Sequence, residues 1–380
     1  MIASVKVAGT TVDLNTIAHD VSITIGRRDL TTTFAPSACR ITFYDVVAST
    51  YTALVGKTLT VTGSAYQLFG GYITDVRLTV ATATSGARCD IIAAGPSSRL
   101  GLLNVNTTGY AQTTLALRCK QITDEVVSQS ADMFFIGETG TDEGAYTLAS
   151  LPAATESATS ALQATVDQVA GVVYDNPHDN TSPTGRVAYY TNDVTTTSST
   201  TMSGDRVVFA PTFEQSGQII NVVVVGYDSG TIERSNATSQ ALYGKRTRTI
   251  GTSILTSTEA TDLADETITR SRRPRWAIND VTITQPDAGA ETLYDRIGGT
   301  LTISSLPVGS PAATYTGIVQ GWEHRVTRGK HQTTFYLADP ADLGKSIAWS
   351  AVPPGYLWNT NPDVTWDNFL TIADLETVGI

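Results

Sequence analysis

Short runs in which apolar and polar residues alternate dominate the first part of the chain. Such runs occupy residues 21–25, 39–44, 59–61, 72–80 and 89–93. Alternation with a period of two predicts strands that bury one face, and the glycines between and inside the runs predict turns or bulges. About five or six short strands within roughly a hundred residues predict a small β-barrel that is closed or nearly closed.

Three segments of this region recur, in the same order, near the end of the chain. The pairs are residues 56–61 with 298–303, 69–73 with 315–319, and 91–96 with 335–340. They share a Gly-x-Leu-x-Val/Ile strand, an aromatic-x-Gly-x-Ile/Val strand and a closing strand that ends in Gly-Pro or Asp-Pro. The spacing between them differs only slightly, which connecting loops tolerate. The repeat predicts that one small β-module is used twice and builds a pseudo-symmetric surface.

The spacing of apolar residues becomes helical between the two copies. It predicts amphipathic helices over 113–131, over a stretch that Pro152 opens and that extends to Val173, and over 257–270. Strands are predicted at 206–209 and 219–226, and the second of these is apolar on both faces, as in a covered sheet. Residues 176–203 predict an exposed, mobile loop, in which 195–201 is close to low complexity.

These patterns predict a mainly β fold with an α+β insert, in which two similar small β-barrels flank a helix-containing middle region. The predicted boundaries are 1–100 for the first barrel, 101–272 for the insert, 273–345 for the second barrel and 346–380 for a C-terminal aromatic arm. The arm contains large aromatic residues in a segment rich in proline and asparagine, which disfavours regular structure. Its candidate partner-interface residues are Trp349, Tyr356, Trp358, Trp366 and Phe369, and packing of these aromatics on the chain's own barrel is the alternative.

The charge and composition exclude several classes of protein. The 380 residues have a formal net charge of −11 and only 16% charged residues, so a general nucleic-acid binder with a basic face is not expected. No apolar run is long enough to span a bilayer, and residues 1–6 alternate without a charged segment and apolar core, so we expect no secretion signal. The three cysteines, Cys39, Cys89 and Cys119, are an odd and widely spaced set that offers neither a disulfide framework nor a CxxC metal pair, and we expect buried thiols.

No catalytic, cofactor or metal site is predicted. Glu323, His324 and His331 lie close together in the second copy, but neighbouring residues of a strand point to opposite faces, and we expect a solvated hairpin there. A segment that begins at Asp339 resembles the end of a phosphate-binding loop, but Asp339 stands where such a loop needs glycine, so no phosphate site is predicted. The basic run from Arg270 to Arg275 is interpreted as a solvated helix end, although contact with DNA or an acidic partner is the alternative.

The two modules, the helical insert and the segment from Tyr243 to Arg246, which leads into a helix with Ala260, Leu263 and Ala264, together resemble the tail hub family of tailed bacteriophages. That family includes the baseplate hub of contractile tails, the late-control tail proteins, the base of the type VI secretion spike, and hub-like minor tail proteins of non-contractile tails. The resemblance covers most of the chain and makes the two barrels tail-tube-like. In one departure from that family, we expect no spike or lysozyme-like domain in the residues after the second copy.

The resemblance implies a non-enzymatic, structural hub protein in the virion tail tip, assembled in the host cytoplasm. It implies a homotrimer, whose two barrels per subunit form a pseudo-sixfold ring around a channel for DNA and the tape-measure protein. Further implied partners are the tail tube or a distal tail protein and other tail-tip proteins, and DNA passes without specific binding. Two alternatives are a receptor- or glycan-binding minor tail protein and, with less support, a wall-degrading enzyme, which would need paired carboxylates at a cleft.

Overall fold

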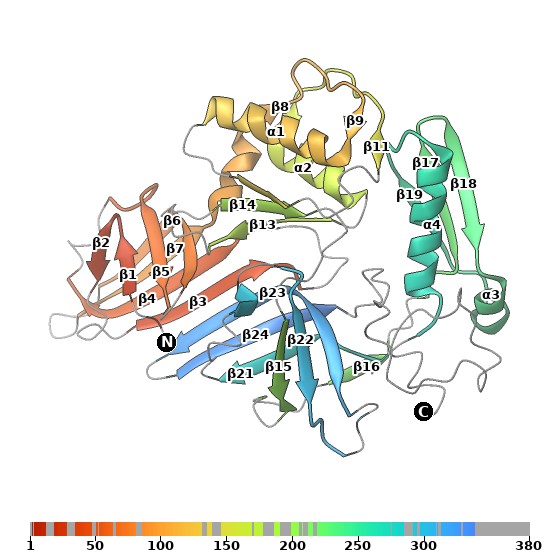
Figure 1. The fold of residues 1–380 in the computed structure, drawn as a ribbon. Helices are drawn as coiled ribbons and strands as arrows, with labels where there is room; N and C mark the ends of the chain where they lie inside the picture. The colour runs from red at the N-terminus through yellow and green to blue at the C-terminus, as the bar shows by residue number, and fades with distance from the viewer. Residues whose placement is uncertain are drawn as a thin grey trace.

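The computed structural model has a mainly β fold with helices between the two sequence copies, and so confirms the predicted fold class (Figure 1). The described residues are 2, 4–12, 19–28, 35–47, 51, 53–63, 66–80, 86–130, 135–138, 146–168, 171–177, 186–190, 199–204, 207, 212–215, 219–274, 276–284, 292–294, 297–308, 310, 313–327 and 330–338.

The first copy of the repeat is a run of antiparallel strands in the spatial order β3-β4-β7-β6-β5-β1-β2. Their bounds are β1 Ser4–Val7, β2 Thr10–Val12, β3 His19–Gly26, β4 Ala38–Val46, β5 Thr58–Thr62, β6 Gln67–Thr79 and β7 Ala87–Ala94. The strands bury alternate residues, as the period-two pattern predicts; β5, for example, buries Leu59 and Val61.

The second copy repeats the central strand order, because β22-β23-β24-β21 corresponds to β5-β6-β7-β4. Its bounds are β20 Trp276–Ile278, β21 Asp280–Thr284, β22 Thr300–Ser304, β23 Tyr315–Thr327 and β24 Lys330–Ala338. The registers also agree. Leu59 lies opposite Gly71 in the first copy, and Leu301 lies opposite Gly317 in the second.

Irregularities of the backbone are repeated as well. The β6–β7 ladder shifts register between Ile73 and Asp75, and the β23–β24 ladder shifts at the equivalent point, between Val319 and Gly321. Gly56 and Gly298 both have left-handed φ angles, of 82° and 95°. A β-bulge and a left-handed glycine at matching positions are evidence for duplication that is independent of residue identity.

The two copies are not separate closed barrels, because β3 of the first pairs with β23 of the second. This pairing joins strands β1–β7 of the first copy and β21–β24 of the second into one 12-stranded sheet, which also includes β15 (Ser199–Ser203) beside β22. Strands β14 (Arg186–Tyr190) and β15 both lie inside the stretch 176–203, for which the sequence predicts an exposed loop, and that prediction is wrong for 186–190 and 199–203. Met202 is buried against the sheet core, and its burial offsets the weak local strand signal.

The middle region covers one part of this sheet (Figure 1). It contains η2 (Pro96–Leu102), α1 (Leu115–Gln129), α2 (Ala158–Asp167), β10 (Phe135–Glu138), β13 (Val172–Asn176), β14 (Arg186–Tyr190), and the short pairs β8 (Asn104–Val105) with β12 (Glu156–Ser157) and β9 (Thr113–Thr114) with β11 (Thr147–Leu148). Strand β13 is buried on both faces. Its Val172 and Tyr174 join the main sheet core, whereas Val173 joins the core of the helices.

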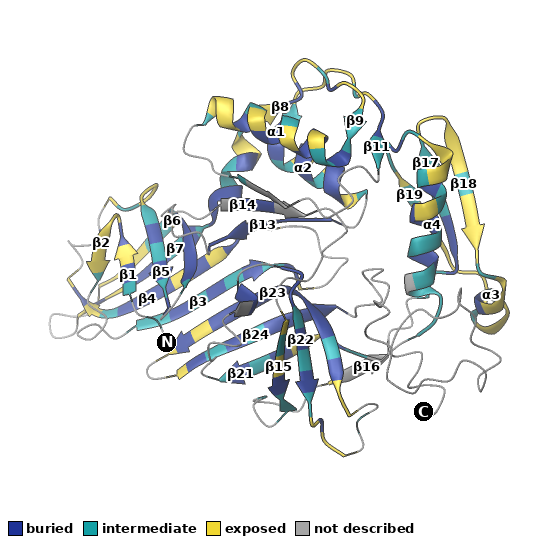
Figure 2. Ribbon diagram, viewed as in Figure 1, coloured by how far each residue is buried: buried dark blue, intermediate teal, exposed yellow. Residues whose placement is uncertain are grey.

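A second part of the middle region consists of β17 (Val222–Tyr227), β18 (Gly230–Ser235), α3 (Ala237–Tyr243), β19 (Thr247–Gly251) and α4 (Ser257–Ser271). Helix α4 packs against the sheet β18-β17-β19, so the strand predicted at 219–226 is covered, as expected. Figure 2 shows that β18 is exposed along most of its length, with intermediate and exposed residues along α4.

The helix predictions at 113–131 and 257–270 are confirmed by α1 and α4. The prediction for the second helix is only partly correct. Helix α2 begins after the cap residue Ser157 rather than at Pro152, because the Ser157 hydroxyl accepts a hydrogen bond from the Ser160 amide. Val173 lies on β13 and not on the helix.

Candidate assembly surface

The two modules meet along a ladder between β3 and the second half of β23. Gly26 lies opposite Gly321, Ile25 opposite Trp322, and Ile23 opposite His324. The backbones approach closely at the start of this ladder, since a Cβ on Gly321 would lie 2.5 Å from the Ile25 carbonyl oxygen. A Cβ on Gly26 would lie equally close, 2.5 Å, to the Gln320 carbonyl oxygen. Glycine at these two positions therefore permits the junction.

Arg27 and Gln320 extend the junction by one residue. The Arg27 amide donates to the Gln320 carbonyl oxygen at 3.0 Å, and its Nε donates to Gln320 Oε1 at 3.1 Å. Both side chains are buried. Gln320 is the residue at the register shift of β23, so the bulge turns its side chain toward β3.

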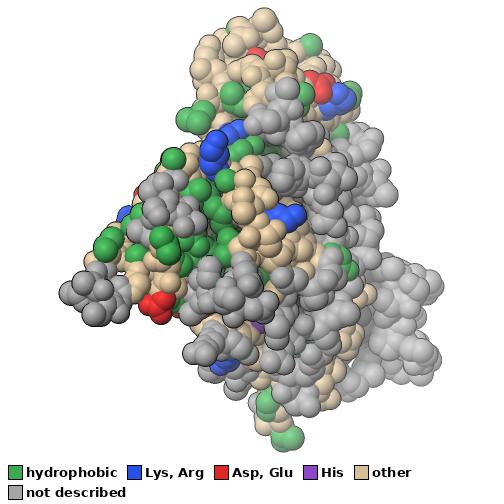
Figure 3. Space-filling view, turned by 90° about the vertical axis from the view of Figure 1, so that its left-hand side faces the viewer, with side chains coloured by type: hydrophobic (Ala, Val, Ile, Leu, Met, Phe, Trp, Pro, Cys, Tyr) green, Lys and Arg blue, Asp and Glu red, His purple; other side chains and the backbone are tan. Residues whose placement is uncertain are grey.

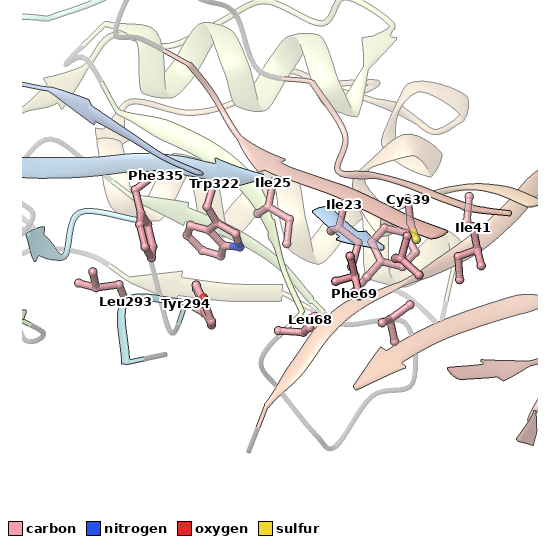
Figure 4. Packing of buried hydrophobic residues seen from close by; sticks show 14 of the residues in the cluster. Ile23, Ile25, Cys39, Ile41, Leu68, Phe69, Leu293, Tyr294, Trp322 and Phe335 are labelled. Carbon is pink, nitrogen blue, oxygen red and sulfur yellow. The ribbon is translucent and has the colours of Figure 1, made fainter. Parts of the chain in front are cut away.

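A continuous apolar layer lies on one face of the joined sheet (Figure 4). The Tyr294 ring centroid lies 5.9 Å from that of Trp322 and 5.8 Å from that of Phe335. Trp322 is almost fully buried next to Ile25 of the other module, within one cluster of buried residues. The two copies therefore share one hydrophobic core, and separating them would expose it to water.

His324 and His331 belong to this core and not to a solvated hairpin, so that sequence prediction is wrong. His331 Nε2 lies 3.2 Å from His324 Nδ1, which lies 3.0 Å from Thr333 Oγ1. Burial lowers the pKa of His324 well below its usual value, and His331 lowers it further. Burial also lowers the pKa of His331 to about 4. Both imidazoles are consequently neutral near pH 7.

Glu323 lies on the opposite face of β23, as the strand geometry predicts. It accepts hydrogen bonds from the Tyr336 hydroxyl at 3.0 Å and from Arg325 Nε at 2.6 Å. Burial and this carboxylate raise the pKa of Tyr336 to about 12. The carboxylate is thus separated from the two histidines by the sheet, and the three residues do not form one site.

Asp175 joins the middle region to the first module, although it is not among the residues predicted from the sequence. Its carboxylate accepts from the Ser37 amide at 2.7 Å, from the Ser97 amide at 2.8 Å and from the Ser97 hydroxyl at 2.8 Å. It is buried, and desolvation raises its pKa. One sequence signal was available, since an acid at the end of an apolar strand implies a nearby donor set.

The second half of β6 is an exposed edge at the position that corresponds to the β23 junction. Residues 75–79 pair with β7 on one side and, among the described strands, with none on the other. Asp75 and Arg77 form an ion pair at 3.2 Å, with side chains 46% and 71% exposed. Figure 3 shows the end of the molecule formed by the first module, where hydrophobic side chains gather and charged ones are few.

The other sequence candidates lie elsewhere. The predicted interface residues of the C-terminal arm (Trp349, Tyr356, Trp358, Trp366 and Phe369) are outside the described residues. Arg272 and Arg273 lie at the end of α4, as interpreted, but they are partly buried and so not fully solvated. The three cysteines are free and buried, as predicted.

Within the described part of the chain, no three or more His, Cys, Asp or Glu side chains are placed to share a metal ion. No described helix is long and apolar enough to cross a membrane.

No family model and no curated protein match this sequence. Solved structures do. A 43 kDa tail protein of prophage MuSo2 from Shewanella oneidensis has a TM-score of 0.64 at 14% identity, over 91% of this chain and 100% of that one. A tail protein from Neisseria meningitidis has a TM-score of 0.62 at 12% identity, over 90% and 97%. A prophage tail protein from Listeria monocytogenes has a TM-score of 0.53 at 8% identity, over 85% and 95%.

These matches extend over nearly the whole of this chain and of each neighbour, so they compare complete folds and not single modules. Because the sequence identities are so low, these matches show similarity of fold and nothing more. The resemblance seen in the sequence repeat is confirmed at that level: the chain has the fold of phage tail proteins.

Proposed function

We propose that the protein is a structural hub of a phage tail tip or baseplate, in which three copies form a pseudo-sixfold ring. The observation that carries this proposal is the duplication, which repeats strand order, register, bulge and left-handed glycine. Similarity to tail proteins over 90% and 91% of the chain supports the same role.

Symmetry explains why a duplicated module suits such a position. Three subunits with two similar modules present six nearly equivalent edges, whereas an unduplicated subunit would have to form a hexamer to do so. Such a ring can join a sixfold tail tube on one side and a threefold tip on the other. The partners proposed on this basis are the tail tube or a distal tail protein, other tail-tip proteins and the tape-measure protein.

The negative net charge of the chain is suited to the wall of a channel for DNA. A formal net charge of −11 gives the protein a negative field, which repels phosphate groups and keeps duplex DNA from adhering to a channel wall. We therefore propose that DNA passes through the ring without specific binding.

The test is the copy number and symmetry of the chain in isolated tails. Quantitative mass spectrometry should give a multiple of three, and electron cryomicroscopy should show a ring with a pore wide enough for DNA. The purified chain can be monomeric at low concentration because subunit association depends on concentration. A copy number in tails that is not divisible by three would contradict the ring.

We also propose that the protein has no hydrolytic activity. Glu323 and the histidine pair lie on opposite faces of the sheet, and both imidazoles are buried. The purified chain should release no products from cell-wall peptidoglycan over a range of pH. Release of products that a Glu323→Gln variant of unchanged stability no longer gives would reveal a site.

A further inference from the structure

The two long strands of the repeat have the same partners except at one place. Strand β23 pairs with β24 on one side along most of its length. On its other side it pairs first with β22 and then, from Gly321 to Val326, with β3. Strand β6 likewise pairs with β7 on one side and with β5 on the first half of the other. Its second half, from Asp75 to Thr79, lacks a counterpart of β3 among the described strands.

The second module contains the strand that corresponds to β3. In the first module β3 runs antiparallel to β4, with His19 opposite Phe43 and Thr24 opposite Ala38. In the second module Val207 bridges Ile283, and β16 (Phe213–Gln215) runs antiparallel to β20, with Phe213 opposite Ile278. The registers of the two copies make Ile283 equivalent to Phe43 and Ile278 equivalent to Ala38.

Strand β16 therefore occupies the place of the second half of β3. Among the described strands, β16 pairs with β20 alone, so the edge with which β3 binds β23 is open on β16. Among the described strands, each chain thus leaves an open edge on the second half of β6 and another on β16. The junction of β23 with β3 shows that two edges of these kinds pair with each other.

We propose that the open edge of β6 pairs with β16 of a second copy of this chain, in the same antiparallel manner in which β3 pairs with β23. The proposal rests on the proposed ring and specifies how it closes. From the β3–β23 register, Arg77 lies opposite Phe213 of the neighbouring copy, because Glu323 lies opposite Thr24. Asp75 lies opposite Gln215, because Gly321 lies opposite Gly26.

The chemistry of the β6 edge suits a specific partner. The charged pair Asp75 and Arg77 protects an open strand against indiscriminate pairing, as charged residues do on exposed edges. The apolar Val76 and Leu78 are only partly covered by the sheet core, and a neighbouring strand would cover them further. Because the two edges are different surfaces, the contact is head-to-tail, and it repeats until the ring closes.

Disulfide trapping in the full-length chain tests the register. The variant Arg77→Cys/Phe213→Cys should form covalent dimers and trimers under mild oxidation, both in tail particles and in concentrated purified protein. A second pair, Asp75→Cys/Gln215→Cys, tests the same ladder without replacing Phe213. The matched control Arg77→Cys/Glu214→Cys slips the register by one residue, which places the two side chains on opposite faces and should prevent linking.

Mixing the single variants Arg77→Cys and Phe213→Cys should give dimers only, because each chain then has one reactive end. The authentic junction supplies a positive control, since Ser22→Cys/Arg325→Cys should link within one chain. If neither in-register pair links in either sample, or if the slipped control links equally, the pairing is wrong. Native mass spectrometry distinguishes a failure of the edge pairing from a failure of the ring. Trimers without a disulfide link would contradict the edge pairing and leave the ring intact. Linked dimers that never close into trimers would support the pairing and contradict a ring of three.

Discussion

Gly26 of β3 lies opposite Gly321 of β23 at the point where the two modules join, and neither position has room for a side chain. The φ angle of Gly26 is also left-handed, at 79°. The junction thus depends on the absence of two Cβ atoms, although neither glycine belongs to the repeat that the sequence reveals.

We expect Gly26→Ala to lower the free energy of unfolding by about 3 kcal/mol, through left-handed strain and a clash with the Gln320 carbonyl. The matched control is Gly56→Ala, which has a similar φ of 82° and nothing within 4 Å of the added Cβ. It should lose only about 1 kcal/mol. Urea titration measures both, and equal losses would show that the close contact is unimportant.

Asp175→Ala should destabilise the protein by about 3 kcal/mol, since it leaves the donors of Ser37 and Ser97 buried without an acceptor. Asp175→Asn keeps one acceptor oxygen and should lose less. The exposed Asp124, which pairs with Lys120, provides the control: Asp124→Ala should change stability by less than about 0.5 kcal/mol. Equal effects of Asp175→Ala and Asp124→Ala would refute the role assigned to Asp175.

The buried histidines predict a loss of stability in mild acid. Their pKa values in the folded protein lie below the ordinary 6.5, with His331 at about 4. The unfolded chain therefore binds protons between pH 6.5 and 4 that the folded chain does not, and the stability present above pH 6.5 is lost as the pH falls. Urea midpoints should decrease over this window, and less steeply in His331→Gln. His19→Gln controls for removal of a histidine outside the pair, and an unchanged slope in His331→Gln would contradict the assignment.

The C-terminal arm remains a prediction from the sequence. Deleting residues 350–380 should leave a folded, soluble protein that no longer enters tails, if the arm docks on a neighbour. Trp358→Ala/Trp366→Ala should have the same effect, since each buried tryptophan contributes about 2 kcal/mol at an interface. Asn359→Ala/Asp367→Ala is the control and should assemble normally. Unfolding or aggregation of the truncated chain would instead make the arm part of the intrachain core.

Local patterns predicted much of the fold correctly. Alternation identified strands such as β3, β4 and β5, helical spacing identified α1 and α4, and the repeat indicated a second module whose register is now seen to match the first. These features follow from short-range geometry, because the period of the apolar residues reports which side chains share a face. The misplaced start of α2 reflects a competing local signal, since both Pro152 and Ser157 favour a helix start.

The sequence by itself determined the two modules, the helical insert and the buried cysteines. Only the tertiary structure decided that β3 binds β23, that 199–203 joins the sheet, and that His324, His331 and Asp175 are buried. The physical reason is that neighbouring strands are joined by backbone hydrogen bonds, which nearly every residue offers alike. Which edge meets which depends on the shape and burial of the whole sheet, and burial then decides whether a polar side chain faces water or the core.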